Sequence, residues 1–413
     1  MTVRLAILVL VLTWAPVVHA DDWPAFRGPT GQGHSLERGL PLEWSESHNV
    51  AWKTAVEGDG WSSPVVANGR VWLTTAVTHD ATGGTSLRVL AFDVASGDPV
   101  VDTEVFSIDD IAAPNPKNSL ASPTPVVSGD RVYVHFGAYG TAGLTTMGEL
   151  IWSTRFPYDS QHGNGGSPIL YEDLLILSCD GYDTAFVVAL DSGTGEIRWQ
   201  APRPNPISQA YSTPLLITVG DRDVLISIGA FRTSALDPVT GEELWRVGYP
   251  EGFSNVPAPA FSRDHGLVFI TTGFQQPALL AVRVDGDGDV TPTHVAWRLG
   301  RGVPHTSSPL VVGDELYVVG DTGIVTCVDV ETGKRRWRDR LWGNYAASPV
   351  YADGRIYFQS EEGLTTVIEP GTVFREVVRN ELDGRTLASL AVSDGSLFIR
   401  SDTHLYRIAE SGE

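Results

Sequence analysis

The 413-residue sequence is poor in cysteine and in basic residues. Its two cysteines, Cys179 and Cys327, lie far apart, which excludes a disulfide scaffold and a cysteine-rich zinc site. Both stand in strand-like apolar contexts and are predicted to be small buried core residues. The 29 Lys and Arg residues against 50 Asp and Glu residues give a formal net charge of −21. Nucleic acids and anionic membrane surfaces are therefore disfavoured as partners.

Familiar catalytic motifs and long apolar runs are also missing. The sequence contains no HExxH, no GxSxG and no glycine-rich phosphate loop, and its spacing names no nucleophile–base pair. Beyond residues 1–20, no stretch is apolar enough to span a bilayer. In residues 1–20, Arg4 precedes a short apolar run and Val18-His19-Ala20 forms a cleavage site, as in a secretory signal peptide. We expect an exported protein, periplasmic or extracellular after cleavage, with an uncleaved anchor helix as the alternative.

The sequence is rich in one repeated phrase. Ser/Thr-Pro, a short apolar run, a glycine-containing turn and an alternating apolar run recur eight times. The anchor positions are Pro64, Pro125, Pro168, Pro214, Pro259, Pro309, Pro349 and Leu390, at intervals of 61, 43, 46, 45, 50, 40 and 41 residues. Each copy predicts a β-hairpin, and the period is that of a four-stranded propeller blade. The sequence therefore predicts an all-β, eight-bladed β-propeller, with a seven-bladed ring containing one irregular copy as the alternative.

The two ends of the chain are predicted to close this ring together. The last copy ends at Ile408 without an outer strand, whereas an unassigned strand-like segment, residues 49–54, precedes the first copy. We expect this N-terminal strand, around Trp52, to complete the last blade, because closure removes open sheet edges. The expected organisation is a signal peptide over residues 1–20, an N-terminal extension over 21–48 and the propeller over 49–413.

A second phrase ends most copies and carries a family resemblance. ALDSGTGEIRW ends at Trp199, ALDPVTGEELW at Trp245 and CVDVETGKRRW at Trp337. The phrase resembles the repeat of the pyrroloquinoline-quinone (PQQ)-like propellers, which include quinoprotein alcohol dehydrogenases and the propeller lipoprotein of the outer-membrane β-barrel assembly machinery. WPAFRGPTGQG (23–33), LPLEW (40–44) and GDVTPTHVAW (288–297) are similar to segments of secreted proteins of this kind. The resemblance implies that tryptophans dock each blade on its neighbour, namely Trp152, Trp199, Trp245, Trp297 and Trp337.

The resemblance also raises a PQQ-dependent oxidoreductase of alcohols or sugars, with PQQ and calcium as cofactors, as an alternative function. Enzymes of that type hold the quinone beneath a disulfide between adjacent cysteines and bind calcium through Glu, Asn and Asp. No motif in this sequence matches those residues. The leading hypothesis is a monomeric, non-catalytic propeller that binds a partner protein or a small ligand, with no cofactor assigned.

One face of such a propeller gathers the loops that lead into the inner strands and those between the second and third strands. Loops on a rigid scaffold are where binding residues concentrate, although any one of these residues could simply complete a turn. The candidates are Trp61, Asn118, Tyr139, His162, Asn164, Tyr211, Arg232, Asn255, His305, Asn344, Tyr345 and Arg385.

Two further groups contain residue types that can bind metal ions. His135, His162 and His305 come from three different blades and would have to converge. Asp285, Asp287 and Asp289 alternate with glycines like the first half of a calcium loop, but the closing Glu is missing. We favour an exposed turn for the aspartates and assign no metal.

Overall fold

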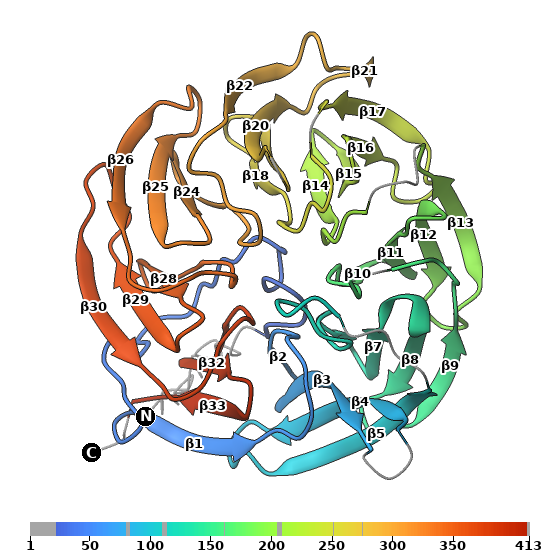
Figure 1. Ribbon diagram of the computed structural model, residues 1–413, viewed down its shortest axis with the longest axis vertical. Coiled ribbons are helices and arrows are strands. Elements are labelled where there is room, and N and C mark those ends of the chain that lie inside the picture. The colour runs from blue at the N-terminus through green and yellow to red at the C-terminus, as the bar shows by residue number, and fades with distance from the viewer. Residues whose placement is uncertain are drawn as a thin grey trace, which may run out of the picture.

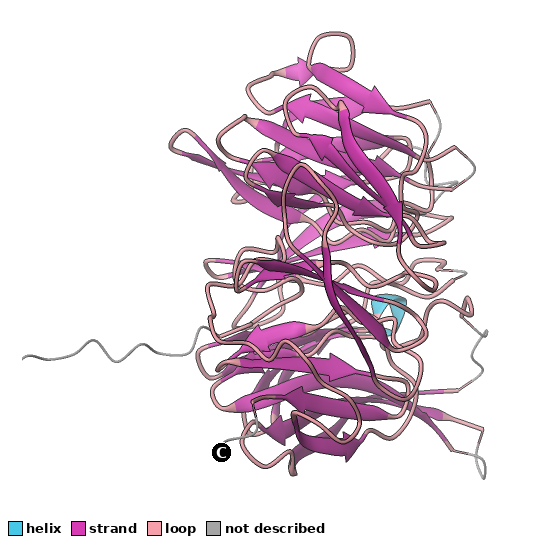
Figure 2. Ribbon diagram, turned by 90° about the vertical axis from the view of Figure 1, so that its left-hand side faces the viewer, coloured by secondary structure: helices cyan, strands magenta, loops and turns pink. Residues whose placement is uncertain are grey.

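The structure is a computed structural model that describes residues 22–79, 83–109, 114–160, 162–204, 209–250, 252–274 and 276–410. The predicted signal peptide lies outside these residues. Within them the strands form eight sheets around a central axis, which confirms the eight-bladed β-propeller (Figure 1). Figure 2 shows strands and loops almost throughout, apart from the short 3-10 helix η1 (Gly137–Tyr139). No helix in the described part of the chain is long and apolar enough to cross a membrane.

Blades are numbered in chain order, and the strands within each blade run outward from the axis. Blade 1 comprises β2 (Val65–Ala67), β3 (Arg70–Thr78), β4 (Thr85–Asp93) and β5 (Pro99–Ile108), and blade 2 comprises β6 (Val126–Ser128), β7 (Arg131–His135), β8 (Thr141–Thr145) and β9 (Leu150–Thr154). Blade 3 comprises β10 (Ile169–Tyr171), β11 (Leu174–Asp180), β12 (Ala185–Asp191) and β13 (Ile197–Pro202), and blade 4 comprises β14 (Leu215–Val219), β15 (Arg222–Ile228), β16 (Arg232–Leu236) and β17 (Glu243–Gly248). Blade 5 comprises β18 (Ala260–Ser262), β19 (Leu267–Thr272), β20 (Ala278–Arg283) and β22 (Val295–Leu299). Blade 6 comprises β23 (Leu310–Val312), β24 (Glu315–Val319), β25 (Ile324–Asp329) and β26 (Arg335–Arg340). Blade 7 comprises β27 (Val350–Ala352), β28 (Arg355–Gln359), β29 (Leu364–Ile368) and β30 (Glu376–Glu381).

Blade 8 is built from both ends of the chain, as predicted. It contains β31 (Ala391–Ser393), β32 (Ser396–Arg400), β33 (His404–Ile408) and, as its outer strand, β1 (Val50–Ala55). β1 pairs antiparallel with β33, with Trp52 opposite Arg407 and Thr54 opposite Leu405. Figure 1 shows β1 lying along the outside of β33. This pairing ties the N-terminal strand to the C-terminal hairpin.

The hydrophobic core lies between neighbouring blades. Each sheet is covered on both faces by the next sheets of the ring, so a middle strand such as β11 is buried along its whole length. The outer strand β13 is instead exposed except at Trp199, which is buried, and Ala201, which is half-buried. Val89 of blade 1 and Val134 of blade 2 belong to one such core cluster. Both cysteines are free and buried, in agreement with the prediction.

The Ser/Thr of the repeated phrase links the blades around the axis. Its hydroxyl oxygen accepts a hydrogen bond from the backbone N–H of the equivalent residue in the preceding blade. The bonds run from Ser63 to Thr124, Thr124 to Ser167, Ser167 to Thr213, Ala258 to Ser308, Ser308 to Ser348 and Ser348 to Ser389, at 2.9–3.0 Å. Because each hydroxyl accepts from a different blade, this axial hydroxyl ring sets the position of one inner strand against the next.

Two junctions of the axial hydroxyl ring use other groups. Ala258 offers no hydroxyl to blade 4, and there the hydroxyl of Ser212 donates to the carbonyl of Pro257 at 2.9 Å. Between blades 8 and 1, the guanidinium of Arg400 donates to the hydroxyl of Ser62 at 2.7 Å. Hydrogen bonds near the axis therefore also cross the two junctions where the repeated bond is not found among the described residues.

Tryptophans in the outer strands join the blades at the periphery. The indole N–H of Trp152 donates to the carbonyl of Ser192 in the next blade at 2.9 Å, and that of Trp199 donates to Pro238 at 3.0 Å. Equivalent bonds are made by Trp52 to Val94, Trp297 to Val330 and Trp337 to Gly371, at 2.8–3.0 Å. The turn glycine of the receiving blade packs flat on the ring: a Cβ on Gly241 would lie 2.5 Å from Trp199, and its φ is +72°.

Trp245 departs from this arrangement. It is 1% exposed, and among the described residues its indole N–H has no hydrogen-bond partner. The receiving turn of blade 5 carries an insertion that forms an extra strand, β21 (Gly288–Asp289), which pairs in parallel with β17. Trp245 lies opposite Gly288 in this pairing, so the insertion covers the tryptophan with backbone instead of accepting its N–H.

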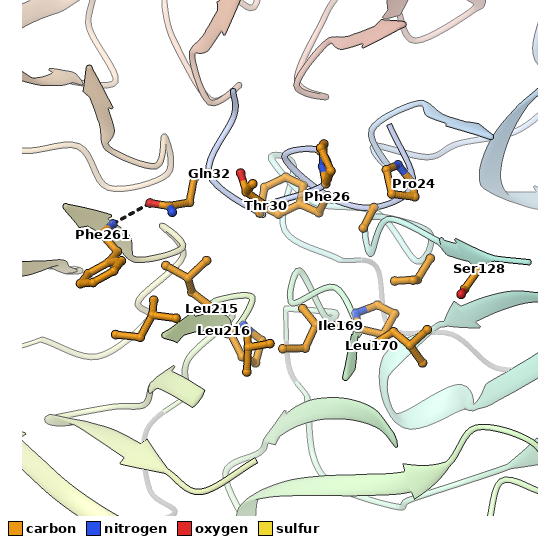
Figure 3. Close-up of a pocket in the computed structure, with 18 of the residues that line it drawn as sticks. Pro24, Phe26, Thr30, Gln32, Ser128, Ile169, Leu170, Leu215, Leu216 and Phe261 are labelled. Carbon is orange, nitrogen blue, oxygen red and sulfur yellow. Dashed lines mark hydrogen bonds between the residues drawn. The ribbon is translucent and has the colours of Figure 1, made fainter. Parts of the chain in front are cut away.

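The predicted N-terminal extension crosses the face opposite the loops that lead into the inner strands. Residues 22–49, here called the N-terminal strap, form backbone hydrogen bonds between Trp23 and Val66 of blade 1 and between Gly33 and Tyr351 of blade 7. Midway, Arg27 is 1% exposed and donates to the carbonyl of Pro309 at 3.0 Å. A cavity of about 450 Å³ separates the strap from the inner strands of blades 2 to 5, with Phe26 above and Leu215 below (Figure 3).

The axial hydroxyl ring predicts a specific stability effect. Ser308→Ala removes the acceptor of the Ala258 N–H and leaves that buried donor unpaired, so the free energy of unfolding should fall by about 1–3 kcal/mol. Ser307→Ala is the matched control, because the neighbouring Ser307 hydroxyl is also buried but has no hydrogen-bond partner in the described residues. Denaturant unfolding measures both. Equal losses in the two variants would contradict a role for the ring.

Tryptophan docking predicts a second effect. Trp199→Phe removes the bond to Pro238 and part of the contact with Gly241, and should lower the free energy of unfolding by about 1–3 kcal/mol. Trp342→Phe, at a position that is 67% exposed, should change it by less than about 0.5 kcal/mol. Thermal and denaturant unfolding of the two variants test the difference, and a tolerant Trp199 would refute the docking role.

Candidate functional site

A cavity of about 500 Å³, here called the outer cavity, opens on the loop face between loops of blades 1 to 6. Its lining residues are Asn115, Lys117, Asn118, His162, Gly165, Tyr182, Tyr211, Phe253, Ser254, Val256, Phe274, His305, Thr306 and Asp321. Four of the predicted candidates, Asn118, His162, Tyr211 and His305, therefore meet in one place. They come from four separate loops that the ring brings together.

An aromatic wall forms one side of the outer cavity. The rings of Phe231 and Phe253 lie 6.0 Å apart, and those of Phe253 and Phe274 lie 5.7 Å apart in an edge-on arrangement. Phe274 remains 52% exposed, which is high for so apolar a side chain. Sequence reasoning missed Phe253 and Phe274, although each follows a glycine in a loop. A large aromatic residue directly after a loop glycine is the sequence pattern that could have identified both residues as candidates.

The backbone beneath this wall is strained. Phe231 adopts a φ of +62°, which a bulky residue rarely does. The conformation is held because the N–H of Phe231 donates to Gly252 at 2.8 Å and its carbonyl accepts from Tyr249 at 2.9 Å. The side chain of Asn255, which is fully buried, donates to the carbonyl of Gly229 at 2.8 Å. Asn255 therefore braces the loops instead of facing the cavity.

The opposite side of the outer cavity is polar. Asp321 accepts a hydrogen bond from the backbone N–H of His305 at 3.0 Å, which holds this carboxylate in place on the polar side of the cavity. At the inner rim, Glu361 forms ion pairs with both Lys117 (2.8 Å) and Arg385 (3.0 Å). The Arg385 guanidinium also lies 5.9 Å from the centre of the Trp61 ring. These contacts link the loop before blade 2 with the loops of blades 7 and 8.

Five other predicted candidates lie apart from the outer cavity. Tyr139 and Asn164 line a separate cavity of about 490 Å³ between blades 2 and 3, which also touches His162. Arg232 forms an ion pair with Glu243. The backbone N–H of Asn344 donates to Glu362, while Tyr345 is fully buried. The structure therefore divides the predicted residues between cavity linings and loop supports.

A buried ion pair lies beneath the loops of blade 3. The Asp180 carboxylate and the Arg203 guanidinium are 3.5 Å apart, with side chains 2% and 9% exposed. Burial raises the pKa of Asp180 to about 6, and the nearby charge of Arg203 opposes that rise. Arg203 also donates to the hydroxyls of Ser178 and Ser227, in blades 3 and 4. The pair therefore joins two blades below the outer cavity.

A second, smaller space lies on the axis below the outer cavity. This axial cavity has a volume of about 120 Å³ and is lined by the axial hydroxyl ring, with Phe26 of the N-terminal strap among its walls. Trp61, Lys117 and Asn118 also line it. Lys117 and Asn118 border both spaces, so the outer and axial cavities share a boundary.

The three histidines do not converge. His135 is buried in β7, with its Nδ1 2.8 Å from the Thr141 hydroxyl, whereas His162 and His305 line the outer cavity. Among the described residues, no group of three or more His, Cys, Asp or Glu side chains is placed to hold a metal ion.

The aspartate-rich loop is engaged in local contacts. Asp289 accepts hydrogen bonds from the N–H and hydroxyl of Thr291 at 3.1 and 2.6 Å and lies 3.6 Å from Arg246. Asp285 lies 3.7 Å from His294. The loop carries β21 and therefore supports blade 4.

The residues present do not fit PQQ and calcium as quinoprotein enzymes hold them. The two cysteines are separate and free, so no adjacent-cysteine disulfide can cover a quinone. The axial cavity, at about 120 Å³, is too small for a fused three-ring quinone. In the outer cavity, Lys117 is the one lysine or arginine among the described lining residues, where a tricarboxylate calls for several donors.

The sequence matches the family described as outer membrane protein assembly factor BamB, in overlapping segments 37–176, 88–289 and 232–373. This chain belongs to that family. The match extends over most of the propeller and confirms the predicted PQQ-like repeat. It agrees with the repeated phrases of the sequence and with the eight blades of the structure.

Individual relatives agree with the assignment. An outer membrane protein assembly factor BamB from Burkholderia pseudomallei (strain K96243) is 25% identical over 331 residues, 68% of this chain and 82% of the relative. The crystal structure of BamB from Moraxella catarrhalis superposes with a TM-score of 0.58 at 14% identity, covering 87% of this chain and 99% of that one. A europium-containing methanol dehydrogenase gives 0.52 at 12% identity, covering 93% and 90%. The last two likenesses show the fold alone.

His135 predicts a pH dependence of stability. Burial lowers its pKa from 6.5 to about 3, so between these pH values the unfolded chain binds more protons than the folded chain. The stability contribution of neutral His135 is complete above pH 6.5 and is lost as the pH falls towards 3. His135→Asn should therefore reduce the slope of unfolding free energy against pH by up to about 1.4 kcal/mol per unit. Denaturant unfolding from pH 4 to 7 measures the slope, with the exposed His162→Asn as control; an unchanged slope in His135→Asn would contradict the prediction.

Proposed function

We propose that this chain is an exported, non-catalytic β-propeller that binds a partner protein through the loop face. The observation that carries the proposal is the outer cavity with its aromatic wall. Phe274 and its neighbours present apolar surface beside polar groups, which is the composition of protein-binding hot spots. A cavity of about 500 Å³ has room for more than one apolar side chain of a partner.

The arrangement of polar groups favours binding over catalysis. In the described part of the chain, no lining hydroxyl is hydrogen-bonded to His162 or His305, so no activated nucleophile is formed there. Asp321 is held by a backbone N–H, and Lys117 is paired with Glu361. These groups suit the orientation of a ligand more than proton transfer.

The family supports the kind of partner and the location. Its relatives are named outer membrane protein assembly factors, and this name supports a protein partner at a bacterial envelope. The signal-peptide pattern of residues 1–20 supports export of this chain across the inner membrane. A periplasmic binding scaffold, with the propeller over residues 49–413, is consistent with both.

Site-specific photocrosslinking tests the proposal. With p-benzoylphenylalanine at position 274, crosslinking in cells of the source organism should trap a discrete partner, identifiable by mass spectrometry. The same probe at Val239, which is 56% exposed on a turn of the opposite face, should not trap it. Phe274→Ser should lower recovery of the partner at least about tenfold, because hot-spot truncations often cost 2 kcal/mol or more. Equal trapping from both positions, or none from position 274, would refute loop-face binding.

The oxidoreductase alternative has its own test. Purified protein incubated with PQQ and calcium should show no dye-coupled oxidation of alcohols or aldose sugars, and no quinone absorbance should remain after desalting. Sustained dye reduction that requires PQQ would overturn the non-catalytic assignment.

A further inference from the structure

The axial cavity is walled by hydroxyl groups with donors to spare. Thr124, Ser167, Thr213, Ser308, Ser348 and Ser389 each accept one backbone N–H, and each is at most 6% exposed. A hydroxyl that accepts one bond still has one O–H to donate. Within the described residues, none of these six donates to a protein acceptor, and all six line the axial cavity.

Such a wall requires acceptors inside the cavity. A buried O–H without an acceptor costs about 1–3 kcal/mol, so the occupant of the space must accept several hydrogen bonds. The described residues that line the axial cavity include neither Asp nor Glu. The axial cavity, which is bordered by hydroxyl donors and one lysine, therefore differs in charge from the chain as a whole, whose formal net charge is −21.

The charges around the axial cavity are positive on balance. At its mouth, Lys117 and Arg385 share a single carboxylate, Glu361. On the strap side, Arg27 is 1% exposed, donates to the carbonyls of Pro309 and Pro349, and makes no ion pair with a carboxylate of the described residues. Asp321 lines only the outer cavity.

The path into the axial cavity leads through the outer cavity. Lys117, Asn118, Gly165, Val256 and Thr306 line both spaces. A ligand with an acidic end and an apolar body could therefore place its charge among the hydroxyls and its body against the aromatic wall. The volumes, about 120 and 500 Å³, suit a carboxylate or small oxyanion in the first and a larger apolar group in the second.

We propose that the axial cavity is an anion site that binds a carboxylate or other small oxyanion entering from the outer cavity. Binding is non-covalent: the ring hydroxyls and the ammonium of Lys117 donate to the anion. The site goes beyond the proposed function, because it needs no protein partner. It can be present whether or not the loop face binds one.

Calorimetric titration of the full chain in a chloride-free buffer tests this proposal. The probes are phenylacetate, its neutral analogue phenylacetamide, and sulfate. We expect saturable one-to-one binding of at least one anion and none of phenylacetamide. Phenylacetate binding more tightly than sulfate assigns the anion to an apolar carboxylate ligand. Equal or tighter sulfate binding assigns it to a free inorganic oxyanion. Absence of saturable heat with both anions means that water alone fills the cavity, and overturns the proposal.

Variants locate the binding in the axial cavity. Lys117→Gln should weaken the anion about tenfold, the effect of losing one charge-assisted hydrogen bond. Ala346→Leu, which fills space in the axial cavity and leaves the Ser and Thr residues of its wall unsubstituted, should abolish binding. Lys334→Gln, the same charge change on an exposed turn, is the control and should bind like the parent chain. Melting temperatures verify folding of each variant. Undiminished binding by folded Lys117→Gln and Ala346→Leu would place the anion elsewhere and refute the site.

Discussion

The hydrogen bonds of the axial hydroxyl ring are the interaction on which the eight blades depend. Near the axis the inner strands converge, and their first N–H groups are buried away from water. Each N–H needs an acceptor that its own short strand cannot offer, and the Ser or Thr of the next blade supplies it. The same residue type therefore recurs before the proline in most copies. Where Ala258 interrupts the series, Ser212 donates across the junction instead.

This inner ring works together with two outer restraints. The docking tryptophans join neighbouring blades at the periphery, where their N–H groups meet a carbonyl in the next turn. The N-terminal strap joins blades on opposite sides of the ring, since its backbone bonds to blade 1 at Val66 and the Gln32 side chain accepts the N–H of Phe261 in blade 5. The loops on the opposite face are thus mounted on a scaffold restrained near its axis, at its edge and across one face. Strain such as that at Phe231 can persist there because the surroundings fix it.

The candidate site follows from where the ring places its loops. The outer cavity combines an aromatic wall with a polar wall, and its floor borders the axial cavity with its hydroxyl donors. One structural element, the axial hydroxyl ring, therefore both positions the blades and lines a ligand-sized space. A protein that is strongly acidic as a whole thus has a small donor-lined space on its axis.

The sequence was enough to predict the number of blades, their hairpins and the closure of the ring at Trp52, because these depend on local patterns that repeat along the chain. It also identified His162, Tyr211 and His305 as loop residues. The packing of the blades places these three residues around one cavity and turns Asn255 and Tyr345 into supports for loops. It also decided that residues 22–49 cross the ring and that Trp245 is covered by β21. Those outcomes depend on contacts between residues far apart in sequence, which no local pattern encodes.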